Sequence, residues 1–141
     1  ESGMNGFSLH LQSAPLTETL VNVTSFIGAD KSGSFGLMAG HERMMTVLEP
    51  GLCRFRPENG EWQYVAVTGG ILYFNDGNLC ISTRRYIRGE DYRTVSDAIR
   101  DILSAEEAVM HDLKGSISRL EQEMTRRLWR LQHGQEEVYG R

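Results

Sequence analysis

The stretch Gly33-Ser-Phe-Gly-Leu-Met-Ala-Gly-His41, continued by Glu-Arg-Met-Met-Thr-Val-Leu-Glu-Pro-Gly51, organises this chain. Three glycines in its first nine residues allow sharp turns around an apolar cluster of Phe35, Leu37 and Met38. A short apolar run follows and ends at the turn signal Pro50-Gly51. An apolar loop on tight turns either packs into a core of its own or faces a partner. These residues alone leave both interpretations open.

Short runs with strand character lie on both sides of this stretch. Residues 7–12 alternate apolar and polar side chains, as a strand with one buried face does. Further runs, separated by turn residues, lie at 20–27 (a second and a third strand), 44–48, 52–56, 62–67, 71–74 and 79–82. The turn at residues 75–78 is a strong hairpin signal. About eight to ten short strands at close spacing predict a β-sandwich.

The sequence then takes on a helical pattern. From Tyr92 to Gln132 it has no proline and one glycine, Gly115. Apolar residues recur at helical spacing, namely Val95, Ile99, Ile102, Leu103, Leu113, Ile117, Leu120, Met124, Leu128 and Leu131. Residues 104–107 fit a capping box and hence a second helix start, although Ser118 and Glu121 fit one equally well. Residues 97–112 are mainly acidic and residues 114–130 mainly basic, which favours an antiparallel hairpin of two helices.

Together these patterns predict an α+β protein with two parts. Residues 1–88 form the β-sandwich, and residues 89–134 form the α-helical hairpin, which ends at Gly134. Residues 135–141 form a frayed tail. Glu1-Ser2-Gly3 reads as a remnant of cloning, with Met4 as the native start.

Bulk composition is that of an ordinary globular domain with an appendage. The 141 residues include 40% apolar and 24% charged side chains. A net charge of −4 does not favour nucleic-acid binding. No apolar run approaches the roughly 18 residues of a membrane span, and no export signal is visible, so we expect the cytosol and no direct membrane insertion. Cys53 and Cys80 are expected to be reduced, buried packing residues.

No pattern of residues indicates catalysis, a cofactor or a metal. His10, His41, His111 and His133 are scattered, without metal-ligand spacing. Neither a nucleophile-elbow pentad nor a phosphate-binding glycine loop occurs. His41 has no visible partner as a catalytic base and is better explained as a turn histidine. An interaction role is therefore the default prediction.

One charged group on the helical segment is more informative. Arg119, Arg126 and Arg130 lie near one helical face, and Arg127 and Trp129 lie on the same turn as Arg126 and Arg130. Such a group is most often a solvated face. The alternative is a docking surface for an acidic partner, because arginine and aromatic residues dominate interface hot spots.

Three motifs in order resemble the epsilon subunit of F-type ATP synthases, and the resemblance covers nearly all of residues 4–133. The first is residues 33–41 followed by Thr46-Val47-Leu48-Glu49-Pro50-Gly51, with Ala39 where the family usually has proline. The second is Val67-Thr68-Gly69-Gly70-Ile71-Leu72. The third is the junction Arg88-Gly89-Glu90-Asp91.

The helical segment from Leu113 through Leu128 resembles the alternate, second-operon form of this subunit, which is often sodium-linked. The ordinary form has a nucleotide-binding motif, Ile/Leu-Asp-x-x-Arg-Ala, that would fall at residues 92–97. Here that segment reads Tyr-Arg-Thr-Val-Ser-Asp, which replaces both the aspartate and the arginine of the motif. The resemblance therefore does not imply that this chain senses ATP through that motif.

The resemblance implies a non-catalytic central-stalk subunit that couples ion translocation through the c ring to ATP synthesis or hydrolysis. Its partners would be the gamma subunit and the c-subunit ring, with the alpha and beta subunits reached through the C-terminal helices. It would lie peripherally on the cytoplasmic face of a bacterial inner membrane. The implied interface comprises Ser34, Phe35, Gly36, Leu37, Met38, Ala39, Gly40 and His41. The implied regulatory face, which would inhibit hydrolysis, comprises Arg119, Arg126, Arg127, Trp129 and Arg130.

A rival hypothesis is a free-standing regulatory sensor that binds a nucleotide between its two helices. Calorimetry with ATP on the isolated chain separates the two hypotheses.

Overall fold

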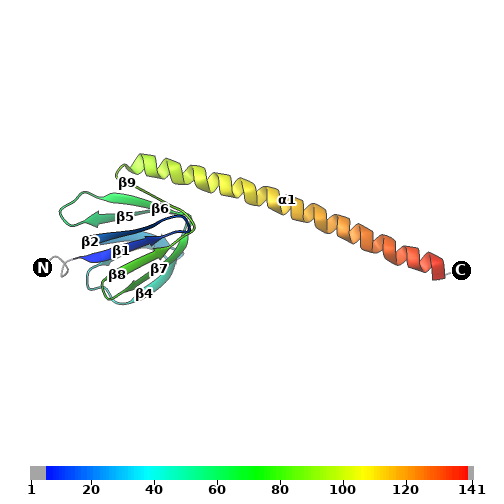
Figure 1. The fold of residues 1–141 in the computed structure, drawn as a ribbon, viewed down its shortest axis with the longest axis horizontal. Coiled ribbons are helices and arrows are strands. Elements are labelled where there is room, and N and C mark those ends of the chain that lie inside the picture. Colours follow the sequence, from blue (N-terminus) through cyan, green and yellow to red (C-terminus); the bar gives the residue numbers. More distant parts are fainter. Residues whose placement is uncertain (1–5, 140–141) are drawn as a thin grey trace. The chain divides into compact units, whose positions relative to one another are not determined.

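The computed structural model describes the backbone of residues 6–139 and the side chains of residues 6–133. Nine strands precede one helix, α1 (Tyr92–Tyr139) (Figure 1). The strands are β1 (Phe7–Gln12), β2 (Thr17–Asp30), β3 (Gly33–Met38), β4 (Met44–Leu48), β5 (Gly51–Pro57), β6 (Gln63–Val67), β7 (Gly70–Asn75), β8 (Asn78–Ser82) and β9 (Tyr86–Gly89). The predicted α+β sandwich is confirmed. The suspected cloning remnant and Met4 lie outside the described residues.

The strands pair in the order β4-β7-β8-β1-β2-β5-β6-β9, and β3 pairs with β2 beside this path. The pairing of β1 with β8 is parallel and the other strand pairings are antiparallel. The curled sheet folds back on itself, so that β1, β8, β7 and β4 lie opposite β5 and β6 (Figure 1). The parallel pair joins an early strand to a late one, which no hairpin signal in the sequence could have predicted.

Strand β2 is one strand of 14 residues, where the sequence predicts two. Asn22 lies in the left-handed region with φ of 57°, and the pairing of β2 shifts register next to it. The first half of the strand pairs with β1 and the second half with β3 and β5. The bend at Asn22 therefore lets one continuous strand cross from one layer to the other, without a turn between two separate strands.

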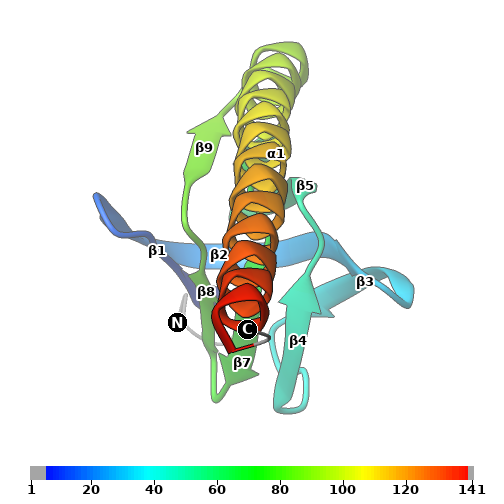
Figure 2. The same ribbon diagram turned by 90° about the vertical axis from the view of Figure 1, so that its right-hand side faces the viewer.

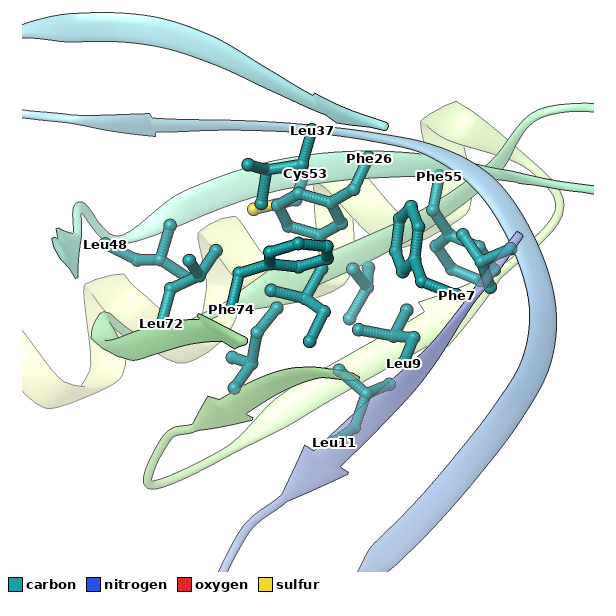
Figure 3. Close-up of a cluster of buried hydrophobic side chains, with 14 of the residues drawn as sticks. Phe7, Leu9, Leu11, Phe26, Leu37, Leu48, Cys53, Phe55, Leu72 and Phe74 are labelled. Atoms are coloured by element: carbon teal, nitrogen blue, oxygen red, sulfur yellow. The ribbon is translucent and has the colours of Figure 1, made fainter. Parts of the chain in front are cut away.

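The core lies between the two layers and is closed by aromatic side chains. Phe7 packs edge-on against Phe74 with ring centroids 5.5 Å apart, and Phe26 and Phe55 are equally enclosed. Figure 3 shows these rings with Leu9, Leu11 and Leu72 pointing into the same space. Cys53 is buried there and burial raises the pKa of its thiol to about 12. Cys80 is only half-buried, although the sequence predicts that both cysteines are buried, and both are free thiols in the structure.

The first three turns of α1 pack against the opposite surface of the sheet. The helix begins after Asp91, whose carboxylate accepts a hydrogen bond from the Thr94 backbone nitrogen at 3.3 Å. Val95 and Ile99 are buried on Ala66, so β6 is covered on both faces. Hydrogen bonds from Thr94 lower the pKa of Asp91, which keeps the capping carboxylate charged.

The predicted helical hairpin is wrong, because α1 is a single unbroken helix (Figure 2). The capping-box residues 104–107 lie inside it, and a Cβ added to Gly115 would meet open space. Neither feature forces a chain reversal when the residues on both sides also favour helix. The helix also continues through Gly134, where the sequence predicts its end. Contacts divide the chain into two compact units, one up to Leu103 and one from Ser104 onward.

Candidate subunit-interface surfaces

The segment at residues 34–38, predicted as an apolar loop on tight turns, lies in the strand β3. It pairs with β2 so that Leu37 lies opposite Phe26. Successive side chains of a strand alternate between its faces, and Leu37 is fully buried in the core. Phe35 is half-buried against the same core, whereas Met38 is 65% exposed. The expectation that Leu37 lies at the surface is therefore wrong, and Met38 is the apolar side chain that β3 leaves outside.

Ala39, Gly40 and His41 form the turn that follows β3. The backbone nitrogen of His41 donates to the Met38 carbonyl oxygen at 3.1 Å. Its Nδ1 lies 2.7 Å from the Glu42 carbonyl oxygen and therefore donates to it. The exposed imidazole also packs edge-on against Phe74, with centroids 5.9 Å apart. These contacts fit a turn histidine that supports the local fold.

A larger apolar surface lies on the outer face of β4 and β7. Its members are Met45, Val47, Ile71 and Tyr73, called here the outer β4–β7 patch. In the strand register Met45 lies opposite Tyr73, and Val47 lies opposite Ile71. Val47 is 66% and Ile71 53% exposed, and Met45 is exposed to a similar degree. Adjacent exposed apolar side chains of this kind indicate a protein-binding surface.

Sequence reasoning missed this patch because it treated residues 44–48 as a uniform apolar run. The signal was present as period-two alternation, since Met44 and Leu48 face the core while Met45 and Val47 face outward. Which set of alternating residues faces the core could be assigned only once the pairing with β7 was known.

The predicted arginine surface lies on the helical unit that starts at Ser104. Arg119, Arg126 and Arg130 are exposed and follow one another at steps of seven and four residues, which places them on one helical face. Arg127 pairs with Glu123, with Nη2 and Oε1 3.2 Å apart. The exposed Trp129 ring stacks on His133 at a centroid distance of 3.8 Å. The indole is therefore held against its own helix.

Two contacts of Glu18 join β2 to β9. Glu18 on β2 accepts hydrogen bonds from the Tyr86 hydroxyl at 2.8 Å and from Arg88 Nη2 at 3.1 Å. These bonds, the one from Tyr86 foremost, lower the pKa of Glu18, and burial together with Glu18 raises the pKa of Tyr86 to about 12. The contacts fix β9, which leads directly into α1.

Asp30, at the end of β2, ties the β2–β3 turn to β4. Its carboxylate accepts bonds from Ser32 and, at 2.6 Å, from the Thr46 hydroxyl. The Ser32 side chain, followed by Thr46, lowers the pKa of Asp30 from its ordinary value of 3.8. A carboxyl group with a lowered pKa in the folded state stabilises the fold above the unfolded-state pKa. That contribution is lost as the pH falls through the folded-state pKa.

The unfolded-state carboxyl group titrates near pH 4. We therefore expect the free energy of unfolding of the Asp30→Asn variant to fall less steeply than that of the wild type below about pH 4. The measurement is the urea unfolding midpoint of variant and wild type across acidic pH. Asp76→Asn, in the β7–β8 turn, removes a carboxylate outside this hydrogen-bond group and is the matched control. A parallel acid slope for Asp30→Asn and wild type would contradict the prediction.

No group of three or more metal-ligating side chains is found among the described residues. Within residues 6–139, the helix lacks a stretch apolar enough to cross a membrane.

Taken together, the geometry defines a small β-sandwich protein whose exposed apolar strands and charged helix offer protein-binding surfaces. Residues 16–89 match the family described as ATP synthase, Delta/Epsilon chain, beta-sandwich domain. The ATP synthase epsilon chain 2 of Cereibacter sphaeroides is 32% identical over 109 residues, which cover 77% of this chain and 75% of that protein. This chain belongs to the ATP synthase epsilon chain family, whose members are non-catalytic subunits. The name of that relative also supports the predicted alternate form.

Two solved structures are similar to this chain, and the first of them shares its fold. A chain of the Euglena gracilis mitochondrial ATP synthase, solved with OSCP, F1 and c-ring, superimposes with a TM-score of 0.56 at 22% identity. The superposition covers 69% of this chain and 63% of that one. A chain of the Tetrahymena thermophila mitochondrial ATP synthase gives a TM-score of 0.49 at 15% identity, covering 57% of this chain and 64% of that one. This chain thus spans less than two thirds of either solved chain.

Proposed function

We propose that this chain is a rotor subunit in the central stalk of an F-type ATP synthase. In this role the sandwich docks on the gamma subunit and the c-subunit ring and turns with them. It couples ion translocation through the ring to ATP synthesis or hydrolysis and lies peripherally at the cytoplasmic face of a bacterial membrane. The observation that carries the proposal is the outer β4–β7 patch, whose apolar side chains are exposed in the isolated chain.

Residues 34–41 also belong to the proposed contact surface, but only some of their side chains contribute to it. Met38 and the turn at residues 39–41 supply exposed groups, while Leu37 and Phe35 anchor the segment to the core. A docking surface on paired strands suits a rotor, because close-packed cores transmit strain with little deformation. The Euglena assembly that contains the similar chain includes F1 and the c-ring, which supports assembly with these partners.

The direct test is capture of the tagged chain from membranes of its own source. We expect the gamma subunit and the c ring to be recovered with it in fixed proportion. Recovery of the chain without any rotary-motor subunit would overturn the proposal.

We further propose that the arginines of α1 slow ATP hydrolysis by contacting an acidic segment of a beta subunit. Arg119, Arg126 and Arg130 form an exposed positive face suited to such a contact. Exposed charge pairs contribute about 0.5 kcal/mol each, so the contact needs several of them. The rival nucleotide sensor is less well supported, because residues 92–139 form one helix and not the two that would enclose a nucleotide.

Replacing Arg119, Arg126 and Arg130 by glutamine in one variant is expected to shift the inhibited population about ten-fold toward active enzyme, at about 0.5 kcal/mol per lost pair. The measurement is the ATP hydrolysis rate of the purified complex. Lys114→Gln, on the same helix but on another face, is the control and should leave the rate unchanged. An unchanged hydrolysis rate for the triple variant would rule out inhibition by these arginines.

A further inference from the structure

Strand β9 and the first half of β2 meet along one side of the sandwich. β9 ends the order of paired strands and, within the described part of the chain, pairs with β6 alone. The first half of β2 pairs with β1 in the opposite layer. Three polar side chains lie between the two strands, Glu18 from β2 and Tyr86 and Arg88 from β9. Side chains therefore join two strands that are not neighbours in the sheet order.

Glu18 is an inward-facing carboxylate. Leu20, two residues further on, packs against the main core, so period-two alternation places both side chains on the inner face of β2. The carboxylate accepts hydrogen bonds from the Tyr86 hydroxyl at 2.8 Å and from Arg88 Nη2 at 3.1 Å. Arg88 also donates to the Gln63 side chain at 3.2 Å. The Glu18 and Arg88 side chains are 29 and 32% exposed, so water screens this ion pair less than it screens a pair on the open surface.

The outer face of β9 carries the start of α1. Ile87 packs with Val95 and Ile99 in the small apolar cluster over Ala66. The helix also lies close to Gly89, because a Cβ added there would come within 2.9 Å of Val95 Cγ2. β9 is therefore held on its inner face by the carboxylate of β2 and on its outer face by the first turns of the helix.

We propose that residues 86–103, called here the strap, open as one unit while the other strands stay paired, and that Glu18 is the residue that holds the strap closed. Two residues, Glu90 and Asp91, separate β9 from α1, so neither element moves far without the other. Opening breaks the four-residue pairing of β9 with β6 and the small apolar cluster. The strands β1, β7 and β8 each pair on both sides and line the main core. Peripheral units of this kind open at a lower free-energy cost than the core.

Opening of the strap has a defined consequence for the sandwich. It frees the edge of β6 that β9 otherwise occupies, together with the apolar surface around Ala66. A free strand edge can pair with an extended segment of another chain. The contacts of Glu18 thus control access to this edge. The strap lies entirely within the unit that ends at Leu103, and the inference does not rest on the rotor proposal.

Thiol labelling of the full chain with iodoacetamide, followed by mass spectrometry, tests whether the strap opens on its own. Val95→Cys in a Cys80→Ser background places a thiol under the strap and leaves Cys53 in the main core as the reference for global unfolding. Val95 is 2% and Cys53 4% exposed, so the reagent reaches either position only when the structure around it opens. We expect position 95 to react at least about ten-fold faster than Cys53, after correction for the rates in urea-unfolded chain. Ile99→Cys provides a second reporter at the same contact.

Variants of the polar contact test the role of Glu18. Glu18→Gln in the same background should raise the labelling rate at position 95 about ten-fold, because hydrogen bonds to an ionised acceptor become bonds to a neutral amide. Tyr86→Phe, which keeps the ring and removes the hydroxyl, should change the rate in the same direction. Glu61→Gln, which removes an exposed carboxylate between β5 and β6, is the matched control and should leave the rate unchanged.

Two results would overturn the proposal. Equal corrected rates at position 95 and at Cys53 would show that the strap opens only when the whole sandwich unfolds. Fast labelling at position 95 that neither Glu18→Gln nor Tyr86→Phe alters would show that α1 leaves the sheet while β9 stays in place. An effect of both variants on the helix reporter supports the strap, because the residues that they change join β2 to β9.

Discussion

Replacing Val47 and Ile71 together with aspartate is expected to lower the affinity of this chain for the gamma subunit at least about 100-fold. The two side chains lie opposite each other in the outer β4–β7 patch and are 66% and 53% exposed. Two adjacent carboxylates there would lose their water if a partner covered them, and burying a charge in this way is costly. Because both side chains are exposed in the free chain, the sandwich itself should remain folded.

The measurement is capture of purified gamma subunit by the tagged chain, with circular dichroism to verify folding. Leu16→Asp with Val21→Asp is the matched control, because these residues are also apolar and exposed but lie outside the patch, one before β2 and one within it. We expect wild-type capture from the control. Equal loss of capture in both double variants, or normal capture by the patch variant, would show that the patch is not part of the interface with the gamma subunit.

Gly70→Ala is expected to lower the free energy of unfolding by about 4 kcal/mol or to prevent folding. A Cβ at Gly70 would lie 2.3 Å from the carbonyl oxygen of Ser82 and 3.1 Å from the Cβ of Thr83. Ser82 is part of β8, which pairs with β7 next to this position, so the oxygen belongs to backbone that cannot turn away. Relief of the clash requires separation of two paired strands, neither of which is at the edge of the sheet order.

Urea unfolding of the purified variant provides the test. Gly115→Ala is the control with the opposite sign, because a Cβ there meets open space in a helix and alanine favours helix over glycine by about 1 kcal/mol. An unfolding midpoint for Gly70→Ala equal to that of wild type would show that β7 and β8 move apart at little cost. The result bears on the motif itself, since Gly69 and Gly70 are the residues through which the chain resembles its family at this turn.

Much of the fold could be predicted from local patterns. Residues 7–12 alternate and form β1, and residues 75–78 form the turn between β7 and β8. The helix was recognised from its apolar spacing, but its division into two was wrong. A capping-box sequence at residues 104–107 is compatible with a helix start and equally with a helix interior, so it could not decide between the two.

The candidate surfaces were predicted only in part. Met38 and the turn at His41 are exposed as the sequence suggested, whereas Leu37 is in the core. Met45, Val47 and Ile71 were not recognised as surface residues. An apolar residue in a strand can face either side, and the choice depends on which strands pair with it.

By itself, the amino-acid sequence determined the order of sandwich and helix and the family to which the chain belongs. Both depend on local periodicity and on short motifs, which can be recognised without knowing which distant residues are in contact. Only the tertiary structure decided which side of β3, β4 and β7 is covered, that β1 joins β8 in parallel, and that α1 stays unbroken. These features depend on contacts between residues far apart in the chain, and a side chain is buried or exposed according to those contacts and not to its neighbours in sequence.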